Sequence, residues 1–234
     1  MEKAAILAAG EGSRIKSITP FKPIVKINGM PLLELTLKNL HFQNFKQVSI
    51  IFNDAERDMD LSLLPGLLSP NINYFYKSTP SSMHSLYEVG LKLELKRGDH
   101  VFVSMVDSIV LPIDAQKFQE FCLALENDES AILVTSFIED EKPLTVRINE
   151  RGYITEFQCP MEEGVLITSG VYYFSENVFP LVVEMIEAGQ NKMRNFLTEL
   201  IKRNYKIKVY KSVKTLDIDR PEDIIGIRLF NKRY

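Results

Sequence analysis

The hydrophobic positions along this chain follow two different spacings. Runs of consecutive apolar residues are typical of buried strands, and they occupy residues 3–8, 47–52, 73–76, 101–106 and 131–137. Other segments carry apolar residues three and four apart, as a helix that covers a core does, and these are residues 31–45, 83–95 and 115–125. Strands that alternate with helices in this way indicate a largely parallel sheet with helices on both of its faces.

The second half of the chain departs from that alternation. Residues 146–148 and 153–157 flank Asn149-Glu150-Arg151-Gly152, which is typical of a hairpin turn. The pattern then predicts a strand over 165–174, helices over 178–188 and 194–204, a strand over 207–210 and a helix from Pro221. We therefore predict a single α/β domain over residues 1–234: three layers around a twisted, mostly parallel, Rossmann-like sheet, with an inserted antiparallel hairpin.

Composition narrows the range of function classes. The net charge of -3 disfavours a nucleic-acid-binding protein, which normally carries a basic face. No stretch approaches the roughly 20 apolar residues that are needed to cross a bilayer. The two cysteines, Cys122 and Cys159, match no metal or redox spacing. We expect a cytoplasmic protein without a nucleic-acid or membrane partner, and the sequence leaves a homo-oligomer open.

A glycine loop follows the first predicted strand, in Gly10-Glu11-Gly12-Ser13-Arg14. Glycines let the backbone turn so that successive N–H groups face phosphate oxygens, and a short helix expected just beyond would add its positive N-terminal end. The loop lacks the third glycine of the dinucleotide fingerprint and the Gly-Lys-Ser/Thr ending of a Walker A loop. Arg14 offers a planar guanidinium for a polyphosphate. Lys22, in Pro20-Phe21-Lys22-Pro23, fits the same role but taken alone also fits a solvated surface lysine.

Three sequence blocks in this region resemble the opening of the sugar-phosphate nucleotidyltransferases. They are Leu7-Ala8-Ala9-Gly10-Glu11-Gly12-Ser13-Arg14, Thr19-Pro20-Phe21-Lys22-Pro23-Ile24-Val25 and Asn28-Gly29-Met30-Pro31-Leu32-Leu33. The resemblance implies a sheet of the nucleotide-diphospho-sugar transferase type and an enzyme that joins a nucleoside monophosphate unit from an NTP to a small phosphorylated acceptor, releasing pyrophosphate. It also implies that the loop residues bind the nucleotide, and that Arg14 and Lys22 contact the triphosphate and stabilise the reacting α-phosphate. Such enzymes supply cell-surface polysaccharide biosynthesis, among other pathways.

Two aspartates are candidates to hold the Mg²⁺ that accompanies an NTP. Asp107 ends the apolar run 101–106, and Asp219 follows the strand predicted over 207–210. Asp107 could instead turn the chain, and Asp219 could be the N-cap of the last helix. Ligands of open parallel sheets bind at the carboxyl ends of the strands, where both aspartates lie. The resemblance also implies a metal ligand at each position, with Asp217 in reserve for the second.

Hydroxyl groups gather where the strand 73–76 leads into a helix, at Thr79, Ser81 and Ser85, with Pro80 among them. They could cap the helix, or bind a base and ribose as the family does in this region. Ser85-Leu86-Tyr87 is similar to the choline-phosphate cytidylyltransferase branch, which weakly favours CTP.

The acceptor site is expected at Glu156 and Gly170. The family often carries Glu-Lys-Pro after the hairpin, with the lysine on the acceptor phosphate, and the matching stretch from Glu156 to Pro160 lacks that lysine. Gly170 corresponds to a glycine that lets the acceptor approach the backbone. Two other functions stay open: a glycosyltransferase of the same α/β type, which would need a second acidic residue beside Asp107, and a nucleotide-binding sensor without catalysis.

Overall fold

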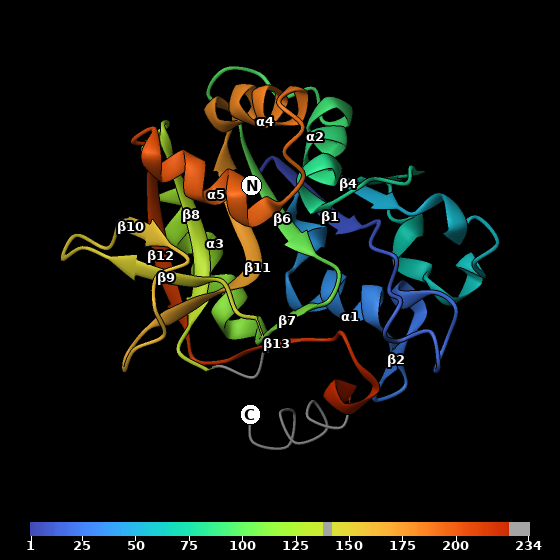
Figure 1. Ribbon diagram of the computed structural model, residues 1–234. Coiled ribbons are helices and arrows are strands. Elements are labelled where there is room, and N and C mark those ends of the chain that lie inside the picture. The colour runs from blue at the N-terminus through green and yellow to red at the C-terminus, as the bar shows by residue number, and fades with distance from the viewer. Residues whose placement is uncertain (138–141, 225–234) are drawn as a thin grey trace.

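The computed structural model describes residues 1–137 and 142–224, and a nine-stranded mixed sheet forms its centre (Figure 1). Seven of the strands are β1 (Lys3–Ala8), β4 (Gln47–Phe52), β5 (Ile72–Tyr76), β6 (His100–Met105), β8 (Glu129–Thr135), β11 (Leu166–Ser175) and β12 (Lys206–Ser212). They lie in the order β5–β4–β1–β6–β11–β8–β12. Of these seven, β11 alone runs antiparallel to its neighbours, which confirms the expected mostly parallel sheet.

The expected hairpin is also present. Its strands are β9 (Thr145–Ile148) and β10 (Ile154–Phe157), which pair antiparallel around the predicted turn. The first two residues of β11 pair with β9, so the hairpin joins the sheet at the start of β11 (Figure 1).

Helices cover both faces of the sheet and give the three predicted layers. They are α1 (Leu32–Asn39), α2 (Ser82–Lys92), α3 (Pro112–Leu123), α4 (Phe179–Glu187) and α5 (Met193–Lys202). Short 3₁₀ turns lie at Lys22–Ile24, Phe42–Asn44, Asp54–Glu56, Leu61–Leu63, Pro65–Leu68 and Glu176–Val178. Helices α2, α4 and α5 pack on one face, whereas α1 and α3 pack on the other.

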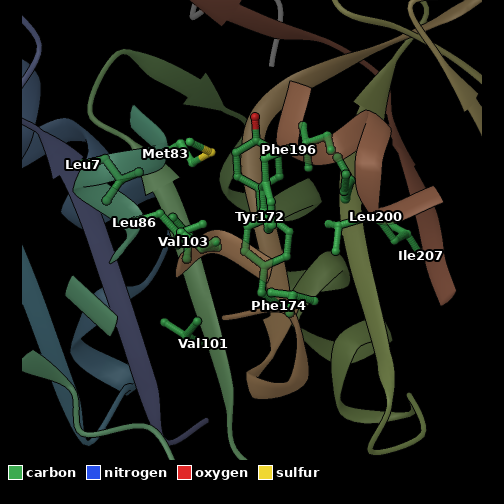
Figure 2. Packing of buried hydrophobic residues seen from close by; sticks show 14 of the residues in the cluster. Leu7, Met83, Leu86, Val101, Val103, Tyr172, Phe174, Phe196, Leu200 and Ile207 are labelled. Atoms are coloured by element: carbon green, nitrogen blue, oxygen red, sulfur yellow. The ribbon is translucent and has the colours of Figure 1, made fainter. Parts of the chain in front are cut away.

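The core under α2, α4 and α5 explains why the apolar spacing predicted these elements. Figure 2 shows Met83 and Leu86 of α2 and Phe196 and Leu200 of α5 directed at apolar side chains of the strands, all of them buried. Full burial of each such side chain contributes about 1.5–3 kcal/mol relative to exposure.

Two small antiparallel sheets were not expected. One joins β2 (Lys26–Ile27) to β3 (Met30–Pro31), and the other joins β7 (Ser108–Val110) to β13 (Thr215–Asp217). The second sheet positions the site, because the strand after Asp107 pairs with the strand before Asp219. The backbone N–H of Ile218 also donates to the carbonyl oxygen of Asp107 at 3.1 Å.

The prediction of a helix after the glycine loop is wrong. Residues 13–18 form consecutive turns, in which the N–H of Ile15 donates to Gly12 O and that of Ile18 to Ile15 O. Each turn closes over three residues rather than four, so no helix N-terminus faces the loop. The helix from Pro221 is present over residues 221–224, and the remainder of that prediction lies outside the described residues.

The remaining sequence expectations concern cysteines and membranes. Both cysteines, Cys122 and Cys159, are free and buried. Among the described residues, none of the helices has the length and apolar character that crossing a bilayer requires.

Candidate active site

A cavity of about 260 Å³ opens where β1 and β6 end, and it brings most of the predicted nucleotide-binding residues together. It is lined by Leu7, Ala8, Gly10, Glu11, Gly12, Ser13, Arg14, Lys22, Met105, Val106, Asp107 and Asp219. Ala9, the one member of the predicted loop set that does not line it, is buried and accepts a hydrogen bond from Asn53 Nδ2 at 2.9 Å. The loop therefore forms one wall of a cavity that both aspartates and both basic residues share.

Gly12 allows the loop to pack closely against Lys22. Its φ is +55°, and a Cβ added there would lie 3.1 Å from Lys22 Cβ. Lys22 itself begins a 3₁₀ turn, and its neighbours Phe21 and Ile24 pack on the core under α1 and α3. The backbone of Lys22 is thus fixed, and its side chain extends along the glycine loop.

Lys22 and the two predicted metal aspartates form one cluster. Lys22 Nζ lies 2.6 Å from Asp107 Oδ2 and 2.6 Å from Asp219 Oδ1, and the Lys22 side chain is only 8% exposed. Burial alone would lower the pKa of this ammonium, but the two carboxylates outweigh burial and raise the pKa well above its usual value. Lys22 is therefore a buried, charged group and not a solvated surface lysine.

Arg14 lies at the outer side of the same cluster. Its Nη1 is 3.6 Å from Asp219 Oδ2, and its side chain is 62% exposed. The guanidinium therefore keeps most of its surface open to the cavity, where it could meet a polyphosphate.

The Asp219 carboxylate contacts Lys22 and Arg14 rather than the described start of the last helix. The backbone N–H groups of Asp219 and Arg220, just before that helix, both donate to Asp223 Oδ2, at 2.8 and 2.7 Å. The Asp219 carboxylate is left to face Lys22 and Arg14. The reserve candidate, Asp217, accepts a hydrogen bond from Ser108 Oγ at 3.3 Å, and it is Asp219 that shares Lys22 with Asp107.

The chemistry of these donors fits a magnesium ion that arrives with phosphates. Two carboxylate oxygens converge on a single cation, the Lys22 ammonium, which here stands in for a metal. Within residues 1–137 and 142–224, no group of three or more His, Cys, Asp or Glu side chains is placed to hold a metal ion. Mg²⁺ needs only one or two carboxylates when phosphate oxygens and water supply the other ligands.

A second cavity, of about 510 Å³, adjoins the first at Asp107 and Met105. It is lined by Pro80, Ser81, Ser82, Met105, Asp107, Ser108, Lys142, Leu144, Thr168, Gly170, Tyr172, Asn191, Lys192, Met193, Arg194 and Asp217. The basic side chains at its rim were missed by the sequence analysis, since lysines and arginines at element ends carry no motif. One of them, Arg194, donates through Nη2 to Lys142 O at 3.2 Å.

The two predicted acceptor residues lie in different places. Gly170 lines the second cavity, but a Cβ added there would meet Ser108 Oγ at 2.2 Å, so protein atoms occupy the space that the missing side chain leaves. Glu156 is not among the described residues that line either cavity, and its carboxylate forms an ion pair with Arg147. The structure therefore brings Gly170 to the site and leaves Glu156 on the surface of the hairpin.

The hydroxyls between β5 and α2 bond to one another rather than capping the helix. Ser81 is the N-cap of α2 but makes no side-chain cap bond, and its Oγ lies 3.0 Å from His84 Nδ1. The hydroxyl oxygens of Thr79 and Ser85 are 2.7 Å apart. Pro80 and Ser81 line the second cavity, so this segment reaches the site from the side opposite the glycine loop.

A buried acid supports the segment next to the glycine loop. Asn53, which donates to Ala9 O, begins a capping box in which Glu56 Oε2 accepts from the Asn53 N–H at 3.1 Å. Glu56 is 4% exposed, and its burial raises its pKa to about 7 although the Asn53 bond acts in the opposite direction. This carboxyl carries a structural role that the sequence did not signal.

Comparison with known proteins identifies the family of the chain. The family model of the MobA-like NTP transferase domain matches residues 4–203. No curated protein sequence matches the chain significantly.

Solved nucleotidyltransferase structures share the fold at low identity. The inositol-1-phosphate CTP transferase from T. maritima has a TM-score of 0.77 at 20% identity, over 95% of this chain and 91% of that chain. A putative glucose-1-phosphate thymidylyltransferase from Bacillus anthracis has a TM-score of 0.81 at 17% identity, over 100% and 96%. The CTP:phosphocholine cytidylyltransferase from Streptococcus pneumoniae has a TM-score of 0.72 at 20% identity, over 98% and 99%.

Proposed function

We propose that this chain, which belongs to the MobA-like NTP transferase domain family, transfers a nucleoside monophosphate unit from an NTP to a small phosphorylated acceptor in a Mg²⁺-dependent reaction. The observation that carries the proposal is the position of Asp107. It contacts Lys22 at the end of the central strand β6, and it lines both cavities. A reacting phosphate beside Asp107 would therefore be accessible from both cavities at once.

In the proposed reaction an oxygen of the acceptor phosphate attacks the α-phosphorus of the NTP. A new P–O bond forms, the bond between the α-phosphorus and the bridging oxygen breaks, and its electron pair leaves with pyrophosphate. The protein's contribution is positioning and charge neutralisation, so no covalent enzyme intermediate is needed. The Lys22 ammonium and the Arg14 guanidinium would offset the negative charge that develops on the phosphate oxygens.

Asp107 and Asp219 are the residues that would hold Mg²⁺. When bound, the ion neutralises phosphate charge and orients the oxygens that it touches. Lys22 would contact the same phosphates from its fixed backbone position, because its side chain lies along the glycine loop.

The acceptor would enter through the larger cavity. Its lining includes Lys192 and Arg194, which suit a phosphate, and the hydroxyl-bearing Thr168. These basic side chains would replace the acceptor-phosphate lysine that is missing after the hairpin. Glu156, which lies outside the cavity, is not part of the proposed site.

CTP is the NTP we favour. Ser85-Leu86-Tyr87 is similar to the choline-phosphate cytidylyltransferase branch, and two of the structural neighbours are named as CTP enzymes. Thr79, Pro80, Ser81 and Ser85 would bind the base and ribose. The proposal also places the enzyme in the cytoplasm as a single domain, supplying activated building blocks for cell-surface polysaccharides.

The test is pyrophosphate release with Mg²⁺, in which four NTPs are crossed with phosphocholine, phosphoethanolamine, inositol 1-phosphate, hexose 1-phosphates and heptose 1-phosphate. We expect release with one NTP and one acceptor, and loss of release with EDTA. Asp107→Asn should abolish turnover with little loss of fold. The matched control is Asp128→Asn, which removes an exposed carboxylate that pairs with Lys206, and it should leave turnover unchanged.

Two results would count against the proposal. Calorimetric NTP binding without pyrophosphate release for any pair would favour a nucleotide-binding sensor. Absence of both NTP binding and pyrophosphate release would refute the proposal that this chain transfers a nucleotide.

A further inference from the structure

The Lys22 ammonium occupies the position on which the two proposed metal ligands converge. Its Nζ is 2.6 Å from one oxygen of Asp107 and 2.6 Å from one oxygen of Asp219, so those two oxygens are at most twice that distance apart. Opposite oxygen ligands of Mg²⁺ are about 4 Å apart. The same pair of oxygens could therefore hold either cation with a small adjustment, but it cannot hold both.

We infer that Lys22 blocks the metal position while no nucleotide is bound, so that the divalent cation binds together with the NTP and not before it. The inference rests on the proposed function for the identity of the nucleotide site. It concerns the order of events at that site, which the proposed reaction leaves open.

The surroundings of Lys22 explain why a metal alone would displace it poorly. The side chain is 8% exposed, so an ammonium pushed away from both carboxylates would stay close to the incoming divalent cation. Two cations about 4 Å apart repel each other strongly at the effective dielectric constant of a protein surface. The backbone is held by the 3₁₀ turn Lys22–Ile24 and cannot carry the charge away.

A bound NTP changes this balance. The cavity along the glycine loop is lined by Lys22 itself, next to Gly10–Arg14, so phosphates placed there would offer the ammonium new anionic partners within reach of its flexible chain. The two carboxylates would then lack the cation between them, with Arg14 left only at the outer oxygen of Asp219, and neighbouring carboxylates repel each other. A metal ion supplied with the NTP restores the missing charge, so each ligand favours the binding of the other.

The test measures Mn²⁺ binding to the nucleotide-free protein by the EPR signal of free Mn²⁺. We expect weak binding to the wild type and binding at least about tenfold tighter to Lys22→Met, since the competing charge is gone. Lys22→Gln, which keeps an N–H donor but removes the charge, serves as the second variant if Lys22→Met folds poorly. The matched control is Lys16→Met, which removes an exposed positive charge six residues away.

A further variant locates the metal. Adding Asp107→Asn to Lys22→Met should return Mn²⁺ affinity to the weak level of the wild type. Circular dichroism at each step verifies that the variants are folded.

The possible results separate the two proposals. Equal Mn²⁺ affinity in the wild type and both Lys22 variants would overturn the inference, as would an equal gain in Lys16→Met. Tighter binding in the Lys22 variants that depends on Asp107 would support it. If that support came while the wild type released no pyrophosphate with any substrate pair, the transfer activity would fail and the role of Lys22 at the cation position would stand.

Discussion

Gly170 offers a sharp test of how the strand β11 positions the site. It adopts φ +74°, a left-handed conformation, at the point where the pairing of β11 with β8 shifts register. A Cβ at this position would lie 2.2 Å from Ser108 Oγ and 3.1 Å from Met105 Cγ. Both neighbours flank Asp107, so Gly170→Ala would disturb the backbone and the side chains that hold the proposed metal ligand.

The expected loss of stability is the sum of a backbone contribution and a packing contribution. A non-glycine residue in the left-handed region costs about 1–2 kcal/mol. Forcing an extra methyl group into a packed interior costs about 1–3 kcal/mol more. Gly189→Ala measures the backbone contribution alone, because the φ of Gly189 is +76° and nothing lies within 4 Å of an added Cβ. We expect Gly170→Ala to destabilise the fold by about 2–5 kcal/mol and Gly189→Ala by about 1–2 kcal/mol.

Thermal unfolding measures the difference, since 1 kcal/mol shifts the Tm of a chain of this size by about 2–4 °C. The steric term can be tested separately by adding Ser108→Ala to Gly170→Ala, with Ser108→Ala alone as the reference. The double variant should regain part of the lost stability because the clashing oxygen is gone. A Gly170→Ala protein that is no less stable than Gly189→Ala, or one that Ser108→Ala does not help, would refute this account of the strand.

Three other predictions concern the acid next to the loop, the acceptor cavity and the metal ligands. Burial raises the pKa of Glu56 from 4.5 to about 7, so the folded protein binds this proton more tightly than the unfolded chain. As pH rises from 4.5 to 7, the unfolding free energy of the wild type should therefore fall by up to about 3 kcal/mol more than that of Glu56→Gln, with no further difference above pH 7. Urea unfolding that shows parallel pH profiles for the two proteins would contradict this. Arg194→Ala and Lys192→Ala should each raise the KM for the acceptor about tenfold, because a charged phosphate contact is lost, and leave the KM for the NTP unchanged. Equal rises in both KM values would show that these residues do not bind the acceptor specifically. Asp219→Asn should lower kcat by at least about 100-fold in the pyrophosphate assay with circular dichroism unchanged, and near-normal turnover would remove it from the metal site.

Periodicity predicted the central strands because their burial leaves a direct trace in sequence. Strands β1, β4, β6 and β8 are covered by helices on both faces, so nearly every residue in them is buried and most are apolar. Burial on both faces does not predict a strand of only three residues. The pairing of β7 with β13 depends on main-chain hydrogen bonds between segments more than 100 residues apart, and no side-chain pattern records it.

Local sequence was equally limited at the glycine loop and the hairpin. A short helix was expected after the glycines, but the chain forms turns there, and Gly12 packs closely against Lys22, a contact that local sequence does not record. Glu156 was assigned to the acceptor site because its stretch resembles the Glu-Lys-Pro segment that the family often carries after the hairpin. Its neighbour across the hairpin, Arg147, offers a closer partner for the carboxylate than the cavity does.

Lys22 shows why the catalytic cluster can be understood only as a unit. Judged by its neighbours in sequence, a lysine between two prolines belongs on the surface, because burying an unpaired ammonium costs several kcal/mol. The partners that make its burial tolerable are 85 and 197 residues away. Asp107 and Asp219 are explained in the same way, since two carboxylates this close would repel each other without a cation between them. The buried Lys22 charge depends on both carboxylates, and each carboxylate has Lys22 as a partner, so replacing any one of the three should change the binding of cations by the whole cluster.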